Sequence, residues 1–291
     1  MENVRLIVDS SANTLTDPSR GLEVVPLTLT IGQENWLDDE QLEMGAFLNK
    51  MEASQEAGKT AAPSIQRWLD SLEGCEKAVI VTMTSGLSGT YSSALQARDI
   101  YLETHPHAQI VVVDSRSAGP ELEVILEGIE SILKDDKLRF ADLEARIAEY
   151  RTKTHLLFVL QSLRNLSLNG RVLPAVAKIA GMLKINLIGT ASVDGDLQPL
   201  TKARGMKKAL RELVKQMKEE KYQGGRVVID HCENEADAEK LKELLLAEYP
   251  EAEITIRPMR GLCSFYAERG GSWSAFTINK LQNKKSRVLL S

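Results

Sequence analysis

The sequence contains few residues of the types that bind metals or form disulfides. Its 291 residues include four histidines and three widely spaced cysteines, Cys75, Cys232 and Cys263. An odd number of scattered cysteines argues against a disulfide framework, so we expect free thiols in a reducing compartment and a cytoplasmic location. His105 and His107 lack further ligands at metal-binding spacing, which favours a surface loop over a metal site. We therefore expect neither a metal nor another cofactor.

The chain also lacks long apolar runs and long basic runs. No apolar stretch approaches the roughly 20 residues of a membrane span, and the first residues lack the basic and apolar regions of a signal peptide. These absences predict no stable membrane insertion. The net charge is −5 and no segment interleaves basic with aromatic residues, so nucleic acid is not expected as a partner. The short cationic segment at residues 280–287 is expected to be a solvated end.

Short apolar strands alternate regularly with helical patterns. The hydrophobic fraction of 43% is sufficient for a sizeable core. Strands are expected at residues 4–8, 22–31, 78–83 and 108–113, with helices beginning at Ser64 and Thr90. Continuous apolar strands separated by amphipathic helices predict an α/β fold with a parallel sheet covered on both faces.

The same alternation continues in the second half of the chain. A charged helical stretch at residues 135–151 is expected to lead into a second unit, which places the domains at residues 1–152 and 153–291. Strands are expected at residues 156–160, 183–190, 195–199, 225–230, 253–257 and 274–278. Helices are expected at residues 202–219 and 236–249.

Small hydroxyl residues follow three of the N-terminal strands. In open parallel sheets, ligands bind beyond the carboxyl ends of the strands. Those ends contain three pairs of serines: Ser10 and Ser11, Ser85 and Ser88, and Ser115 and Ser117. We therefore expect a polar rim at this edge of the sheet.

The segment "TSGLSGTYSSA" at residues 84–94 is the richest part of this rim. Gly86 and Gly89 permit positive φ angles and a close approach of the backbone to a ligand. The helix that begins at Thr90 offers amide groups without internal partners, and an anion is favoured at that point. A tight turn capped by hydroxyl groups explains the same residues equally well.

Other chemistries fit this segment less well. It lacks the lysine of a phosphate-binding P-loop and does not match Gly-x-Gly-x-x-Gly, so a nucleotide is not indicated. A nucleophilic serine would need a base, and the nearest histidines lie beyond the following helix, which disfavours serine hydrolysis. Arg171, after Asn169-Gly170, and Arg269, before Gly270-Gly271, are candidate partners for an anion. A solvated arginine is the alternative reading at both positions.

Eight segments, in this order, carry a resemblance to a known family. They are "VDSSANT" (8–14), "VVPLTLTIG" (24–32), "TAAPS" (60–64), "TSGLSGTYSSA" (84–94), "VVDSRSAG" (112–119), "SLRNLSLNGRV" (162–172), "LIGTASVDGDLQPLTKARG" (187–205) and "DHCENEADAEKL" (230–241). Together they resemble the DegV family of bacterial fatty-acid-binding proteins, which includes the binding subunit of fatty acid kinase. The resemblance extends over nearly the whole chain.

The resemblance implies a two-domain α/β carrier. It implies an N-terminal parallel sheet flanked by helices, and a C-terminal α/β domain with a mixed sheet that covers the ligand tunnel. The family's carboxylate-binding residues fall on Thr60, Ser88, Gly89 and Arg171. Ser10, Ser117 and Arg269 are further candidate neighbours of the head group. The expected partners are a long-chain fatty acid such as palmitate and a separate fatty acid kinase.

Three positions depart from the family pattern near the expected head group. Ala61 and Ala62 replace a Ser-Gln pair beside Thr60, and Ala267 stands where the family has a histidine. Arg269 is a candidate to take over part of the role of that histidine, a hypothesis that an Arg269→Ala variant tests. A buried carboxylate needs hydrogen bonds to offset its desolvation, so these positions bear directly on ligand choice.

The leading interpretation is a lipid-binding carrier that has no catalytic activity of its own. The alternative is a phosphotransferase or hydrolase that acts on a small polar substrate at the same serine-rich loop. This alternative rests on a fold-level analogy with dihydroxyacetone kinases, in which a histidine holds the substrate, and no histidine occurs in the rim segments. A regulatory protein that senses a lipid is a third interpretation, which the sequence does not separate from a carrier.

Overall fold

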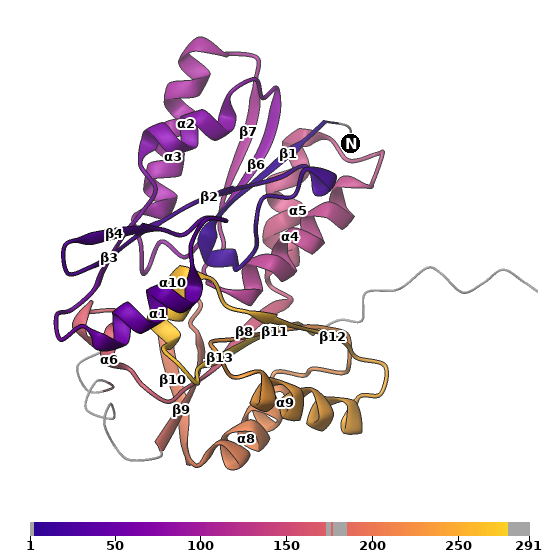
Figure 1. The fold of residues 1–291 in the computed structure, drawn as a ribbon. Coiled ribbons are helices and arrows are strands. Elements are labelled where there is room, and N and C mark those ends of the chain that lie inside the picture. Colours follow the sequence, from indigo (N-terminus) through magenta and orange to yellow (C-terminus); the bar gives the residue numbers. More distant parts are fainter. Residues whose placement is uncertain (1–2, 173–175, 177–184, 279–291) are drawn as a thin grey trace, which may run out of the picture.

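The computed structural model describes residues 3–172, 176 and 185–278. Among these residues the strands form a four-stranded sheet, a six-stranded sheet and a small three-stranded sheet. The two larger sheets lie one above the other in Figure 1, with helices around and between them. The architecture is the expected α/β fold, with one parallel and one mixed sheet. The domain boundary at residues 152 and 153 stays a prediction.

The four-stranded sheet is parallel throughout. Its strands, in spatial order, are β2 (Leu22–Val25), β1 (Arg5–Asp9), β6 (Lys77–Thr82) and β7 (Gln109–Asp114). Successive side chains of a strand face opposite sides, so Ile7 packs beneath one layer of helices and Val8 beneath the other. The first layer is α2 (Ile65–Leu72) and α3 (Thr90–Thr104), and the second is α4 (Pro120–Leu133) and α5 (Leu143–Arg151). The Ser64 hydroxyl accepts a hydrogen bond from the Arg67 amide and caps α2, as its position in the sequence indicates.

The apolar run at residues 22–31 forms two strands rather than the single strand expected. It is divided between β2 and β3 (Thr28–Ile31), which belong to different sheets. Pro26 lies at the division, and a proline cannot donate an amide hydrogen bond to a continuing ladder. β3 pairs with β4 (Glu34–Leu37) and β5 (Lys59–Ala61), and α1 (Met44–Ala53) follows β4 in the chain.

The six-stranded sheet belongs to the second half of the chain. Its strands, in spatial order, are β10 (Leu197–Arg204), β9 (Ile185–Ala191), β8 (Thr154–Leu160), β13 (Ser272–Thr277), β11 (Arg226–His231) and β12 (Glu253–Pro258). Only β11 and β12 pair in parallel. The helices α8 (Met206–Glu219) and α9 (Glu235–Glu248) cover one face. Residues 202–204 extend β10, so the helix expected at residues 202–219 begins later, at Met206.

Helix α4 lies between the two large sheets. Leu122, Ile125 and Ile129 pack with the parallel sheet, whereas Val124 packs with Val228 and Ala275 of the mixed sheet. The residues that face the parallel sheet recur at helical spacing, and Glu123, Glu127 and Glu130 form ion pairs with arginines elsewhere in the chain. The charged stretch at residues 135–151 was expected to form one helix, but only α5 is an α-helix there.

A second apolar core fills the space beside the small sheet. It includes Leu29 of β3, Phe47 of α1 and Phe158 of β8. Leu166 of α6 (Arg164–Leu168) and Phe265 of α10 (Gly261–Ala267) complete it. This core therefore joins segments from both halves of the chain, and several of its residues also line the cavity described below. Within the described ranges, no helix has the length and apolar character needed to cross a membrane.

Buried charged groups also connect the two halves. The Asn13 side-chain amide donates to Asp230 Oδ2 over 2.8 Å, and Arg257 Nε donates to Asp230 Oδ1 over 2.9 Å. Arg257 also pairs with Glu123 of α4 over 3.1 Å, and Glu123 pairs with Arg20 over 2.9 Å. Asp230 is fully buried, so this network replaces its hydration with bonds to both halves of the chain.

Candidate functional site

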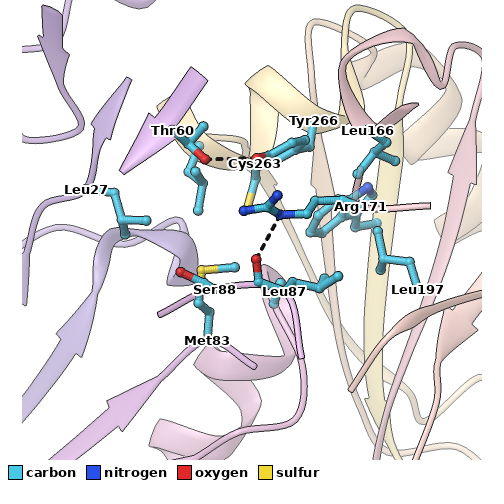
Figure 2. A pocket seen from close by; sticks show the side chains of 13 residues that line it. Leu27, Thr60, Met83, Leu87, Ser88, Leu166, Arg171, Leu197, Cys263 and Tyr266 are labelled. Atoms are coloured by element: carbon cyan, nitrogen blue, oxygen red, sulfur yellow. Dashed lines mark hydrogen bonds between the residues drawn. The ribbon is translucent and has the colours of Figure 1, made fainter. Parts of the chain in front are cut away.

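A small cavity lies where the serine-rich loop meets the second half of the chain. Its volume is about 30 Å³, and its wall combines residues from β5, the loop before α3, α6, β13 and α10. The polar wall residues include Thr60, Ser88, Arg171 and Tyr266 (Figure 2). The rest of the wall is mainly apolar, with Leu27, Met83 and Leu166 among its members.

Ser88 and Gly89 form the turn that begins α3. The Ser88 hydroxyl lies 2.7 Å from the Thr90 hydroxyl and accepts a weak hydrogen bond from the Thr90 amide. Among the described residues, the amide groups of Ser88 and Gly89 donate to no protein acceptor. The loop therefore presents a hydroxyl and unpaired amides at the positive end of a 15-residue helix, an arrangement that favours an anion.

The two loop glycines differ from their expected conformations. Neither Gly86 nor Gly89 has a positive φ angle. A side chain at Gly86 would instead meet the β9–β10 turn, because its first carbon would lie 3.1 Å from the Asp194 carbonyl oxygen. Packing against this turn explains Gly86, whereas space remains open at Gly89.

Thr60 lies on β5, opposite Leu29 of β3, and faces the same cavity. Its hydroxyl lies 2.8 Å from the Tyr266 hydroxyl of α10. Tyr266 is 7% exposed, and burial raises the pKa of its phenol, although Thr60 and the charge of Arg171 act in the opposite direction. The phenol therefore stays protonated at neutral pH and acts as a neutral donor or acceptor.

Arg171 reaches the cavity from the segment after α6. Its Nε donates to the Leu87 carbonyl oxygen over 2.9 Å, and its Nη1 donates to the Asn169 carbonyl oxygen over 2.5 Å. Both acceptors are neutral, and no carboxylate of the described chain forms an ion pair with this guanidinium. The half-buried positive charge is thus held rigidly beside Ser88 without an acidic partner.

The other three candidate residues do not line this cavity. The Ser10 hydroxyl accepts a hydrogen bond from the Leu27 amide, and the Ser117 hydroxyl donates to Glu121 Oε2 over 2.5 Å. Arg269 pairs with Glu52 over 3.2 Å and with Glu233 over 3.0 Å. Its charge is therefore already balanced elsewhere, and a role for Arg269 at the head group stays a prediction.

A larger hollow of about 770 Å³ lies next to the cavity. The two share Leu87, Arg171 and Leu197 as wall residues. The rest of its border comes from the β9–β10 hairpin, including Ser192 and Asp196, and from Gly86 and the segment around Arg171. Arg171 thus stands between an enclosed, mainly apolar space and a wider opening.

A buried carboxylate, Asp9, supports one wall of the cavity. Its Oδ2 accepts a hydrogen bond of 2.6 Å from the amide of Met83, and its Oδ1 accepts one of 2.9 Å from Ser11. Burial of the fully enclosed carboxyl raises its pKa from 3.8 to about 6, despite these bonds. The Asp9 carboxyl group therefore fixes the backbone at Met83. Because burial disfavours its charged form, ionisation of Asp9 lowers the stability of the folded state.

We expect Asp9 to lower stability as the pH rises from about 4 to about 6. In this window the folded state holds the Asp9 proton more firmly than the unfolded state, so the free energy of unfolding falls by roughly 3 kcal/mol in all. Asp9→Asn removes this contribution, and the difference between wild type and variant in urea unfolding should change across the window. A difference that stays constant with pH would contradict the assignment.

Comparison with known proteins agrees with this architecture. The family model described as "Uncharacterised protein, DegV family" matches residues 3–279. The chain belongs to the DegV family. A DegV domain-containing protein of Streptococcus pneumoniae is 37% identical over 279 residues, which cover 94% of this chain and 99% of that protein. The resemblance inferred from the eight segments is therefore confirmed.

Solved DegV structures share the fold across nearly the whole chain. A DegV family protein of Eubacterium eligens loaded with heptadecanoic acid has a TM-score of 0.91 and 38% identity, and covers 95% of this chain and 100% of its own. The fatty acid kinase B3 protein of Streptococcus pneumoniae loaded with linoleic acid also has a TM-score of 0.91, with 37% identity. The match covers 95% of this chain and 100% of that protein's chain. A DegV protein of Ruminococcus gnavus with vaccenic acid has a TM-score of 0.86 and 30% identity, and covers 94% of this chain and 99% of its own.

Sequence reasoning missed several wall residues of this DegV protein. The fold brings Thr60, Ser88 and Arg171 to one cavity as expected, whereas sequence analysis does not single out Tyr266, Met83 and Cys263 as wall residues. Tyr266 directly precedes Ala267, which stands where the family has a histidine. A polar side chain next to that position was the available indication that Tyr266 faces the site. Apolar wall residues gave none, because cavity-facing and core-facing positions follow the same pattern. All three cysteines are free, as their number and spacing indicate, and the structure buries all three.

Proposed function

We propose that this DegV protein binds a long-chain fatty acid and holds its carboxylate at Ser88, Gly89, Thr60 and Arg171. The observation that carries the proposal is the guanidinium of Arg171, which lies beside hydroxyl and amide donors and has no acidic partner in the described chain. A carboxylate satisfies this set, because it offers the negative charge and several acceptor positions. The heptadecanoic and linoleic acids bound in two related DegV structures support this ligand class.

The acyl chain would occupy the apolar side of the cavity. A volume of about 30 Å³ holds roughly two water molecules, so the walls have to move apart for a chain of many methylenes. Flexible side chains such as Met83 and Leu87 line the cavity and are suited to this rearrangement. Each buried methylene then contributes about 0.8 kcal/mol, which makes the tail the main source of affinity.

We further propose a cytoplasmic carrier that has no catalytic activity of its own and presents the carboxylate to a separate fatty acid kinase. The hydroxyl of Ser88 contacts Thr90 rather than a base, and no histidine of the described residues bonds to it. This arrangement gives no support to a hydrolase or phosphotransferase at the loop. The larger hollow beside Arg171 is the side from which ligand and kinase would reach the head group.

Mass spectrometry of small molecules released by denaturing the purified protein tests the ligand class. We expect one long-chain fatty acid per chain, or, for protein stripped of lipid, a higher unfolding temperature on adding palmitate or oleate. If no lipid is released and neither acid stabilises the protein, the fatty-acid proposal is wrong. A screen of small polar anions against the same site would follow.

A further inference from the structure

Tyr266 is held in place from both ends of α10. At the start of the helix, Asp38 accepts hydrogen bonds of 2.8 Å from the Gly261 amide and 2.9 Å from the Leu262 amide. After the last turn, Glu268 Oε1 accepts bonds of 2.9 Å from the Ser162 hydroxyl and 3.1 Å from the Asn165 amide.

The backbone at Glu268 supports the same conclusion. Its φ of 55° and ψ of 170° are unfavourable for a residue with a side chain, so the two carboxylate bonds hold it against local strain. A phenol fixed in this way is preorganised, which reduces the entropy lost on binding a ligand.

The Thr60–Tyr266 pair leaves one hydroxyl hydrogen available. Each hydroxyl has a single hydrogen, and one of the two is used in the bond between them. A phenol is more acidic than an aliphatic alcohol, so the favourable arrangement beside an anion has Thr60 donating to Tyr266 and Tyr266 donating to the anion. In this arrangement Thr60 contributes to the head-group site through Tyr266 rather than by a hydrogen bond of its own to the carboxylate. Hydrogen bonds in such a chain polarise and strengthen one another.

We propose that Tyr266 is a direct ligand of the bound carboxylate, which its phenol contacts as a neutral hydrogen-bond donor. This inference rests on the proposed function and deepens it by adding a head-group ligand. Figure 2 shows the Tyr266 hydroxyl, Thr60, Ser88 and the Arg171 guanidinium around one space. The head group is then recognised by hydroxyl donors and a single cation.

Tyr266→Phe removes the phenol oxygen and keeps the ring, so the packing of α10 is largely preserved. We expect the variant to bind oleate about tenfold more weakly, measured by isothermal titration with lipid-stripped protein. Tyr101→Phe is the matched control, because Tyr101 is also buried and its hydroxyl donates to the Cys75 carbonyl oxygen far from the cavity. We expect this control to bind oleate within twofold of wild type.

A double-mutant cycle with Thr60→Val separates direct contact from an indirect effect through Thr60. If Tyr266 contacts the carboxylate, the double variant binds more weakly than Thr60→Val alone by at least threefold. If Tyr266 only orients Thr60, the double variant and Thr60→Val bind equally, and the inference is overturned. Unchanged affinity in Tyr266→Phe with weakened affinity in Ser88→Ala overturns the inference and keeps the proposed function. Absence of oleate binding by wild type overturns both.

Discussion

Ser88→Ala is expected to weaken binding of a long-chain fatty acid by on the order of 10- to 100-fold and to leave the fold intact. The hydroxyl lies at the cavity wall at the start of α3, where it can donate to a carboxylate oxygen. A hydrogen bond to a charged group contributes about 1.5–3 kcal/mol, which corresponds to this range. Isothermal titration with palmitate or oleate on lipid-stripped protein measures the change.

Ser92→Ala is the matched control for this loss. Ser92 lies one turn further along α3, and its hydroxyl interacts only with the neighbouring Gln96 side chain. The control should retain wild-type affinity, and both variants should unfold at nearly the wild-type temperature. Equal affinities for Ser88→Ala and Ser92→Ala would remove Ser88 from the proposed head-group site.

Asp230→Ala is expected to lower the free energy of unfolding by about 3 kcal/mol or more. Asp230 is fully buried and accepts hydrogen bonds from Asn13 of the first half and Arg257 of the second. Its removal leaves the partly buried Arg257 guanidinium, whose side chain is 18% exposed, with Glu123 as its remaining ion-pair partner. Breaking a buried pair from one side is costly because the other charge stays desolvated. Urea unfolding at neutral pH measures the loss.

An exposed ion pair supplies the control for Asp230. Arg139 and Asp142 lie 2.7 Å apart at the surface, with side chains 78% and 43% exposed. Asp142→Ala should lower the free energy of unfolding far less than Asp230→Ala, because solvent screens such pairs. A loss below 1 kcal/mol for Asp230→Ala would show that the network adds little to the joining of the two halves.

The sequence predicts most of the parallel sheet because its strands and helices follow simple periods. Trp68, Leu69 and Leu72 recur at helical spacing, and the observed α2 agrees with them. The run at residues 22–31 was extended too far, since its apolar pattern continues past Pro26 and conceals the change of sheet. Helix α4 was not predicted, although Leu122, Ile125 and Ile129 recur at helical spacing and Pro120 lies at the first helical position.

Only some of the polar residues of the cavity were predictable from the sequence. Ser88 and Thr60 stand out because small hydroxyl residues at strand and helix ends are chemically distinctive. The bond between Tyr266 and Thr60 joins residues separated by 206 positions in the chain, a proximity that only the folded structure reveals. Tertiary packing also decides whether a serine faces a ligand or bonds to a neighbouring side chain. Ser117 is an example of the second case, because its hydroxyl donates to Glu121.

The position of α4 between the two sheets limits how these proteins can be recombined. Its residues pack against the parallel sheet on one side and against Val228 and Ala275 on the other. A change in the position of the helix therefore affects its packing against both sheets. A chimaera that joined the first half of this chain to the second half of a relative would bring a helix shaped for a different sheet. The two halves are therefore expected to change together rather than as exchangeable modules.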